Sequence, residues 1–331
     1  MTARGITAAL VLCAAALALP LPVAGLDYPA PAHDPSIAKE GEWYYLFSTG
    51  PGITVQRSRD LVSWQLVGSV FRTPPAWTYK EVPRFDGTVW APDISEVNGR
   101  WYLYYAISSF GSNQSCIGLA VSAALDPKSP DYRWEDQGKV IGSLPRRDDW
   151  NAIDPNIAHD DAGYCLVFGS FWDGIKMTPI DPSTGKPKSD PPEILSVARR
   201  APGVSGDPIE APFIFRHADY FYLFVSYDFC CRGIRSDYKI AVGRSTQITG
   251  PYSDRDGTPM TRGGGTVVLE GSGDVHGPGH NAALHDGDKD WLVHHMYDGK
   301  RGGMAVLQVR PLTWSDDGWP VAGPALEARK P

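Results

Sequence analysis

The sequence is poor in cysteine, in excess charge and in long apolar runs. Five cysteines in 331 residues are too few for a fold that depends on disulfides, and their spacing does not suit a zinc site. The formal net charge of −7 argues against binding nucleic acid through a basic surface. After residue 25 no apolar run is long enough to span a bilayer. We therefore expect neither a nucleic-acid partner nor a membrane partner.

The sequence is rich in turn-forming and aromatic residues. It contains 35 glycines and 29 prolines, together with 11 Trp, 15 Tyr and 11 Phe. Frequent glycine and proline favour many short strands over long helices. Aromatic residues favour strands and can also provide flat surfaces on which a ligand stacks. We find no amphipathic pattern for a helix of ten or more residues after the N-terminal segment.

The N-terminus has the pattern of a secretory signal peptide. A single Arg4 precedes the apolar run 6–19, and small residues follow at 23–25. The run is short for a membrane span, so we predict a signal peptide over residues 1–25 and a secreted protein. An uncleaved N-terminal anchor is the alternative. The remaining residues, 26–331, would form one domain.

The later cysteines leave two possibilities open. Cys230 and Cys231 are adjacent, so in an oxidising compartment they could form a bridge with each other, or they could be two buried thiols. Cys116 and Cys165 complete an even number. Residues 113–115 form a sequon for N-glycosylation, which matters only in a eukaryotic host.

One pattern recurs five times along the chain, and it determines the predicted fold. A proline or alanine stands eight or nine residues before an aromatic-rich run, with a turn signal between them, so each copy reads as a β-hairpin. The runs begin 58, 63, 57 and 70 residues apart and are Trp43–Ser48, Trp101–Ala106, Tyr164–Gly169, Phe221–Ser226 and Trp291–Met296. Further strands follow most hairpins, which gives three or four strands per copy. The sequence therefore predicts an all-β, five-bladed β-propeller in a single domain; two sandwich domains would not explain one motif in five copies.

Acidic residues stand at matched positions of these repeats. Asp34, Asp154 and Glu210, with His280, come just before or at the start of the first strand of four copies. First strands line the channel of a propeller, so these side chains should meet at one mouth of the channel. Crowded carboxylates raise one another's pKa and are costly to bury without a function. Hydrolysis of a glycosidic bond needs such a set: an ionised carboxylate activates water and a protonated one protonates the leaving oxygen.

Six motifs in order resemble glycoside hydrolase family 43, and more narrowly its endo-1,5-α-L-arabinanases. They span about residues 28–314 and are His33–Ser36, Thr88–Asp93, Trp150–Asn156, Gly169–Trp172, Ile209–Pro212 and Gly277–Asn281. The resemblance implies a five-bladed propeller that hydrolyses linear arabinan, a pectin side chain, with inversion and without an organic cofactor. It makes Asp34 the general base, Glu210 the general acid, and Asp154 the residue that tunes the pKa of Glu210 and orients it.

The resemblance also implies substrate-binding and metal-binding residues. Aromatic faces suit furanose rings, and a glycine lets the backbone approach a sugar. The implied substrate contacts are Trp90, Phe110, Ser115, Gly118, Asn151, Ala152, Ile153, Ser170, Phe171 and Trp172. His280 would bind one calcium or sodium ion on the propeller axis, with water completing the coordination. His294 and His295 alternate in a strand, so only one should face inward, and the sequence suggests no further metal ligands beside them.

Several alternatives remain at this stage. An exo-arabinanase, an arabinofuranosidase or a β-xylosidase of the same family would differ in the loops that close the cleft, and the segment Arg72–Gly87 could form such a wall. A retaining fructosidase-type propeller would need a nucleophile at close range. A catalytically silent, sugar-binding propeller would not need three acids. We expect a monomer that acts on polysaccharide.

Overall fold

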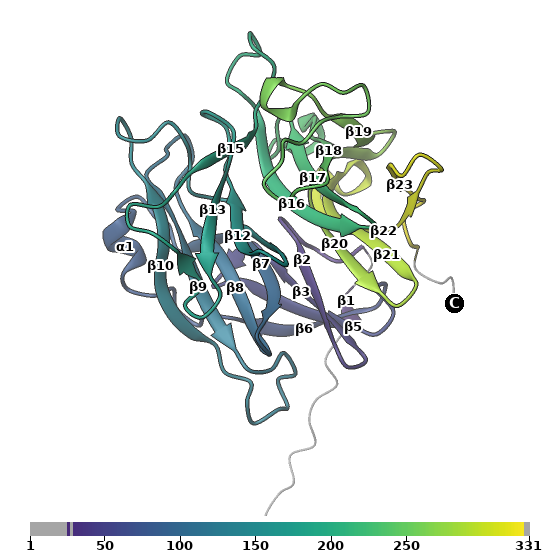
Figure 1. Cartoon of the computed structure of the whole chain (residues 1–331). Helices are drawn as coiled ribbons and strands as arrows, with labels where there is room; N and C mark the ends of the chain where they lie inside the picture. Colours follow the sequence, from purple (N-terminus) through teal and green to yellow (C-terminus); the bar gives the residue numbers. More distant parts are fainter. Residues whose placement is uncertain (1–24, 27–28, 328–331) are drawn as a thin grey trace, which may run out of the picture.

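The computed structural model describes residues 25–26 and 29–327, so the predicted signal peptide lies almost entirely outside the described residues. Five antiparallel sheets follow one another around a central axis (Figure 1). Blade 1 contains β2 (Ser36–Glu40), β3 (Trp43–Ser48), β5 (Thr54–Ser58), β6 (Trp64–Ser69) and β1 (Gly25–Leu26). Blade 2 contains β7 (Thr88–Val97), β8 (Arg100–Ile107), β9 (Ser115–Ser122) and β10 (Glu135–Ser143), with β4 (Gly50–Pro51) added beside β7.

The other three blades have the same order from the inner strand outward. Blade 3 contains β11 (Asn156–Asp160), β12 (Gly163–Phe168), β13 (Ile175–Asp181), β14 (Lys186–Pro187) and β15 (Leu195–Ala198). Blade 4 contains β16 (Ile209–His217), β17 (Tyr220–Tyr227), β18 (Lys239–Ser245) and β19 (Thr266–Leu269). Blade 5 contains β20 (Val275–Asp286), β21 (Lys289–Asp298), β22 (Met304–Trp314) and β23 (Pro320–Ala322). The predicted five-bladed propeller is confirmed.

Helical segments are short in the described part of the chain. They are α1 (Thr78–Glu81) and the 3₁₀ turns η1 (Gly233–Arg235), η2 (Met260–Arg262) and η3 (Gly299–Arg301). None of these segments has the length and apolar character of a membrane span.

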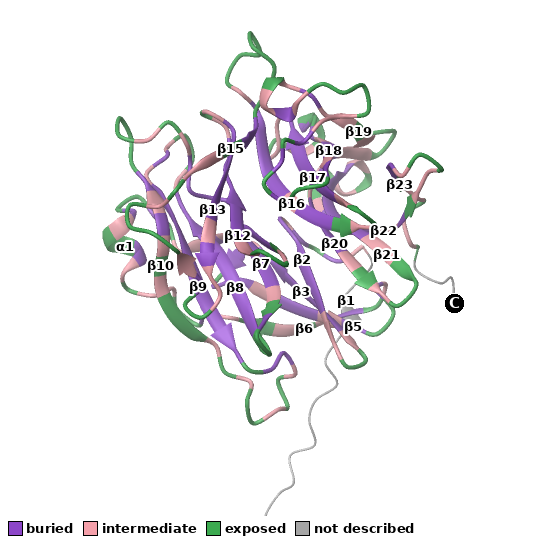
Figure 2. Cartoon of the chain, in the orientation of Figure 1, coloured by how far each residue is buried: buried purple, intermediate pink, exposed green. Residues whose placement is uncertain are grey.

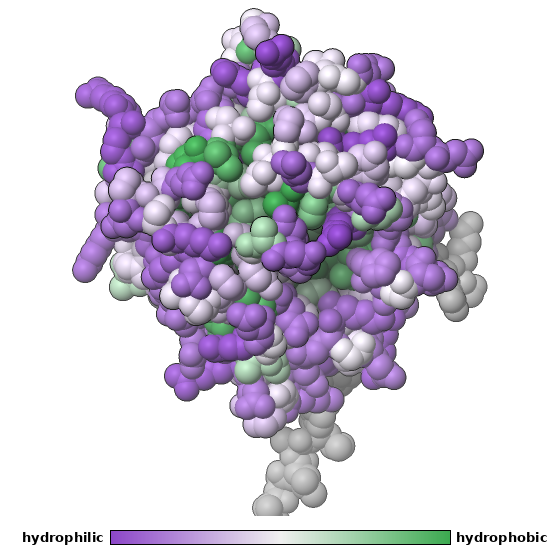
Figure 3. All heavy atoms as spheres, viewed as in Figure 1, coloured by the Kyte–Doolittle hydropathy of each residue, from purple (hydrophilic) through white to green (hydrophobic). Residues whose placement is uncertain are grey.

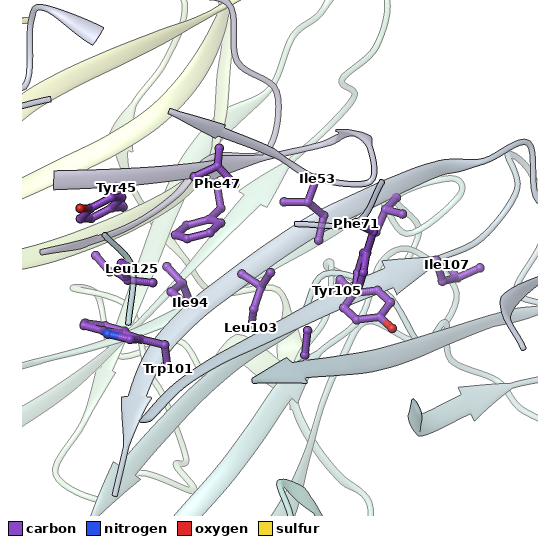
Figure 4. Close-up of a cluster of buried hydrophobic side chains, with 14 of the residues drawn as sticks. Tyr45, Phe47, Ile53, Phe71, Ile94, Trp101, Leu103, Tyr105, Ile107 and Leu125 are labelled. Carbon is purple, nitrogen blue, oxygen red and sulfur yellow. The ribbon is translucent and has the colours of Figure 1, made fainter. Parts of the chain in front are cut away.

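The hydrophobic core lies between neighbouring blades. Side chains of blades 1 and 2 form one cluster, in which Phe47 of β3 and Leu103 of β8 are almost fully buried (Figure 4). Buried residues occupy the strands, whereas exposed residues are concentrated in the loops (Figure 2). On the face seen in Figure 3, hydrophobic atoms gather toward the middle and hydrophilic atoms cover the periphery. The ring is closed where Leu307 of β22 donates its N–H to Ala30 O at 2.8 Å.

The five inner strands share an unusual backbone conformation at their cleft end. In each blade, one residue other than glycine, just before the inner strand or within its first part, is in the left-handed region, where a side chain is disfavoured. These residues are Asp34 (φ 50°), Ala91 (φ 43°), Asp154 (φ 56°), Ala211 (φ 54°) and His280 (φ 48°). Four of them directly precede a proline of the repeat, and His280 stands two residues before Ala282. A similar bend in every blade therefore lies at one mouth of the channel.

Polar side chains join adjacent inner strands below this mouth. In three successive joints, a buried side chain accepts a backbone N–H from the next blade. The three bonds are Ile94 N–H to Ser36 Oγ at 3.1 Å, Ile157 N–H to Asp93 Oδ2 at 3.0 Å, and Ile214 N–H to Asn156 Oδ1 at 2.9 Å. These bonds satisfy backbone groups in the water-poor centre of the ring and fix the position of each inner strand against the next.

Candidate active site

A cleft of about 1350 Å³ lies at the mouth of the channel and is lined by all five blades. Asp34, Asp154, Glu210 and His280 line it together, as the repeat positions predicted. All three acidic residues are largely buried: Asp34 is 8% exposed, Asp154 is 6% exposed and Glu210 is 7% exposed. A buried carboxylate needs hydrogen-bond partners or a proton, so the surroundings of each acid indicate its charge state.

Asp34 is surrounded by groups that favour its ionised form. Thr49 donates its hydroxyl to Asp34 Oδ2 at 2.6 Å, and His33 Nδ1 lies 2.9 Å from the same oxygen. His280 Nδ1 is 3.2 Å from Asp34 Oδ1. Burial alone would raise the pKa of Asp34, but the nearby His33, His280 and His295 outweigh burial and lower it well below its ordinary value. Asp34 is therefore suited to accept a proton.

Glu210 and Asp154 are surrounded by groups that favour a bound proton. Burial, with a smaller contribution from the charge of Asp34, raises the pKa of Glu210 to about 7, although a 2.6 Å hydrogen bond from Ser170 Oγ opposes this rise. Burial and the charges of Glu210 and Asp34 raise the pKa of Asp154 as well. Because the charge of Glu210 opposes ionisation of Asp154, the two acids together retain a proton. Asp154 Oδ2 also accepts the N–H of Ala211, which ties it to the residue after Glu210.

Most of the predicted substrate contacts line the cleft. Among the aromatics, Phe110 is 73% exposed and Trp172 is 38% exposed, and the ring centroids of Trp90 and Phe110 are 5.3 Å apart. Aromatic side chains that pack a core are buried, so large exposed aromatics in a cleft indicate instead a binding surface for a ligand with apolar faces. The predicted residues that line the cleft are Trp90, Phe110, Asn151, Ile153, Ser170, Phe171 and Trp172.

The other three predicted substrate contacts, Ser115, Gly118 and Ala152, are not among the residues that line the cleft. Ser115 is buried and shares a 2.8 Å hydrogen bond with the hydroxyl of Ser108. Gly118 lies under the ring of Tyr105, where an added Cβ would come within 2.5 Å of the ring. Its lack of a side chain therefore makes room for a tyrosine rather than for a sugar. Ala152 is fully buried.

Four residues that the sequence did not predict as site residues complete the site. Thr49 follows β3 and connects two blades, because its hydroxyl oxygen accepts the N–H of Ala91 at 2.8 Å while donating to Asp34. His295 Nδ1 accepts the N–H of Asp34 at 3.1 Å. His33 stacks on His295 with 4.3 Å between ring centroids, and its Nε2 lies 2.9 Å from Tyr297 Oη. His33 was part of a family motif, and the alternation of His294 and His295 indicated that one of them faces inward. Thr49 and Tyr297 follow their aromatic runs directly, and the repeat does not relate these positions to the cleft.

His280 lines the cleft, and its surroundings fit only a loosely held ion. Burial lowers its pKa and leaves a neutral imidazole that can bind a metal. Its Nδ1 faces Asp34, the nearby oxygen ligand, so a hard cation would depend mainly on water. His33, Asp34 and His295 also lie close enough together to be possible metal ligands. Our expectation that no further metal ligands lie beside His295 was therefore wrong. However, both nitrogens of His33 and Nδ1 of His295 already have hydrogen-bond partners.

The alternatives for the cysteines and the sequon are also resolved. Cys230 and Cys231 are bonded to each other and line the cleft, so they are not two buried thiols. Cys116 and Cys165 are buried and free. Asn113 is 3% exposed, and its side-chain amide donates to the carbonyls of Asp148 and Trp150 at 3.0 Å. The side-chain nitrogen of Asn113, to which a glycan would be attached, is therefore already hydrogen-bonded inside the fold.

Three buried carboxylates with opposed proton affinities, in an open aromatic cleft on a propeller, define a glycoside hydrolase. Residues 28–320 match the family described as glycosyl hydrolases family 43. The chain is 46% identical over 296 residues to the extracellular exo-alpha-(1->5)-L-arabinofuranosidase ArbA of Cellvibrio japonicus, covering 87% of this chain and 85% of the relative. It is 42% identical over 293 residues to the extracellular endo-alpha-(1->5)-L-arabinanase 1 of Bacillus subtilis, covering 87% and 86%.

A solved structure agrees with these relatives. The alpha-L-arabinanase of Cellvibrio cellulosa complexed with arabinohexaose matches with a TM-score of 0.85 and 45% identity, covering 88% of this chain and 95% of that one. The chain therefore belongs to glycosyl hydrolases family 43.

Proposed function

We propose that the chain is a secreted, inverting endo-hydrolase of the 1,5-α-L-arabinofuranosidic linkages of linear arabinan. The observation that carries the proposal is the opposed pair of acids in one cleft: Asp34 is held ionised, and Glu210 has a pKa raised to about 7. The names of the similar proteins, which act on α-1,5-linked arabinose, support the choice of substrate.

In the proposed mechanism Asp34 is the general base and Glu210 the general acid. Asp34 takes a proton from water as the water attacks the anomeric carbon, and Glu210 gives its proton to the leaving oxygen. Asp154 helps Glu210 to retain its proton. Its hydrogen bond with the N–H of Ala211 also holds the turn that carries Glu210. The acids come from blades 1 and 4, which suits a water molecule between base and sugar and hence inversion. NMR of the first product formed would show the β-anomer; an initial α-anomer would mean retention.

The proposed sugar contacts are the aromatic and polar residues of the cleft. Trp90, Phe110 and Trp172 would contact apolar faces of the sugar rings. Asn151 has a buried Oδ1 without a partner in the described structure, which suits a hydroxyl donor. His280 would hold a calcium or sodium ion, which when bound would supply positive charge near Asp34. Dialysis against a chelator should then lower the melting temperature or the activity, and unchanged values would remove the ion from the proposal.

Endo action is favoured by the size of the cleft, which extends across all five blades and exceeds the space that one pentose needs. Exo action is the second candidate, because the 46% identical relative is named an exo enzyme. The residues to compare are those that could close one end: Asp86 of the Arg72–Gly87 segment and the loop 201–207, both of which line the cleft.

A product time course on debranched linear 1,5-arabinan, resolved by chain length, tests the proposal. Mixed oligosaccharides at the earliest times would support endo action. Arabinose or one fixed oligomer from the start would mean an exo enzyme with a blocked cleft. Absence of any product on arabinan, xylan and aryl glycosides would favour a silent sugar-binding propeller. For secretion, the N-terminus of protein recovered from the culture medium should begin near residue 26.

A further inference from the structure

Tyr297 connects the cleft wall to the residues that hold the base. It lies in β21, two residues from His295, so both side chains face the same side of the strand. The side chain is 4% exposed. Its hydroxyl oxygen accepts the backbone N–H of Cys231 at 2.7 Å and lies 2.9 Å from His33 Nε2. One phenol group therefore contacts both a cleft loop and the residue before Asp34.

The direction of these hydrogen bonds suits an ionised Asp34. Burial raises the pKa of Tyr297, so its hydroxyl keeps its hydrogen. The phenol oxygen accepts the N–H of Cys231, and the phenol shares a second hydrogen bond with His33 Nε2. With Nε2 held by the phenol, the ring presents Nδ1 to Asp34, and Nδ1 lies 2.9 Å from Asp34 Oδ2. Without the phenol, the ring could rotate or change tautomer and leave Asp34 without this donor.

The position of the Cys231 N–H depends on a constrained loop. Cys230 and Cys231 are adjacent and bonded to each other, and Cys231 has a φ of +64°, in the left-handed region. The sulfur of Cys231 is 3.8 Å from His33 Nε2. Both cysteines line the cleft, and Cys231 is exposed. The bridge limits the conformations of this loop and so holds the N–H toward Tyr297.

We propose that Tyr297 is a positioning residue for the base Asp34, acting through His33, and that the bridged Cys230–Cys231 loop holds the Tyr297 hydroxyl in place. This inference rests on the proposed role of Asp34. It assigns the bridge a function in catalysis through three successive contacts, which join Cys231 to Tyr297, Tyr297 to His33, and His33 to Asp34.

Replacement of Tyr297 by phenylalanine removes only the hydroxyl. Tyr297→Phe should lower kcat about tenfold or more, with KM on linear arabinan changed less than twofold, because a misplaced base affects the chemical step rather than binding. The matched control is Tyr104→Phe, which removes a buried hydroxyl that donates to Gly185 O at 2.9 Å outside the cleft. That variant should lose stability and keep kcat. Equal kcat in the two variants would overturn the proposal.

Reduction of the bridge provides the second measurement on the folded protein. Dithiothreitol gives two electrons and two protons to the sulfurs of Cys230 and Cys231, the S–S bond breaks, and the reagent closes to a cyclic disulfide. We expect wild-type kcat to fall severalfold. Tyr297→Phe should show little further loss, and the Cys230→Ser/Cys231→Ser variant should not respond to the reagent. Equal fractional losses in wild type and Tyr297→Phe would overturn the role of the bridge.

Asp34→Asn separates this inference from the proposed function. If Asp34→Asn abolishes turnover while Tyr297→Phe is fully active, the base is confirmed and the positioning role of Tyr297 fails. If Asp34→Asn retains turnover, the proposed function of Asp34 itself fails, whatever Tyr297→Phe does.

Discussion

At the scale of single residues, the raised pKa of Glu210 makes the stability of the folded protein depend on pH. Its folded-state pKa of about 7 exceeds the ordinary value of 4.5, so the folded protein binds this proton more tightly than the unfolded chain does. Stability from this group is therefore complete below about pH 4.5, decreases as the pH rises, and is lost above about pH 7. Glu210→Gln removes the ionisation and should raise the free energy of unfolding at pH 8 by up to about 3 kcal/mol.

The measurement is denaturant unfolding of wild type and Glu210→Gln at pH 4 and pH 8. At pH 4 the two proteins should be nearly equally stable, while turnover of the variant should be about 10² to 10⁴-fold lower. Glu42→Gln is the control, because this glutamate is on the surface with an 82% exposed side chain. Since this variant keeps Glu210, its free energy of unfolding should match that of wild type at both pH values. A Glu210→Gln variant that is no more stable at pH 8 than wild type would contradict the raised pKa.

Residue roles were predictable where the repeat or a family motif carried them. Asp34 and Asp154 stand directly before a proline at matched positions, and Glu210 is one residue displaced, so the chain itself indicates that they meet. Thr49 and Tyr297 reach the site from strand ends and from a second strand, and their contribution depends on side-chain directions that no repeat records. The sequence could not show that Gly118 lies beneath the ring of Tyr105, because a glycine beside a sugar and a glycine beneath a tyrosine ring have the same sequence signal.

At the scale of elements, Asn156 joins three inner strands. Its Nδ2 donates to Asp93 Oδ1 at 3.0 Å, and its Oδ1 accepts the N–H of Ile214 at 2.9 Å. Asn156→Ala would leave a buried carboxylate and a buried N–H without these partners, which costs the desolvation of both groups. We expect a loss of about 2–4 kcal/mol in the free energy of unfolding.

Ser36→Ala is the matched variant for this joint. Ser36 accepts one backbone N–H, that of Ile94, so its loss should cost only about 1–2 kcal/mol. Chemical denaturation of both variants and wild type measures the difference. If Asn156→Ala were no more destabilising than Ser36→Ala, the inner strands would be held by packing between blades rather than by these polar joints.

At the scale of the whole molecule, the five blades were predictable because one hairpin motif recurs and each copy has the same two-residue turn. The structure pairs Glu40 with Trp43 and Val97 with Arg100 across such turns. The sequence could not predict how the ring closes, because Ala30 and β22 lie at opposite ends of the chain and carry no shared motif. It also could not predict which loops border the cleft, since these loops differ from blade to blade.

The pH dependence of activity is a property of the closed ring, because base and acid come from blades 1 and 4. Asp34 has a lowered pKa and stays ionised through the acidic range, so it gives no loss of activity near pH 5. Glu210 must be protonated, and its pKa is about 7. We expect kcat/KM on arabinan to be nearly constant from pH 5 to 6.5 and to fall about tenfold per pH unit well above pH 7.

A substrate with a good leaving group tests the origin of the alkaline loss. Nitrophenolate leaves without protonation, so hydrolysis of a nitrophenyl arabinoside of suitable chain length needs Asp34 but not the proton of Glu210. Its kcat/KM should stay level to about pH 8.5, and Glu210→Gln should retain far more activity on it than on arabinan. The same alkaline loss on both substrates would mean that the titrating group is not the acid. If kcat/KM instead fell only as the pH was lowered, the group that must be ionised would be the one with the raised pKa. Glu210 would then be the base and Asp34 the acid.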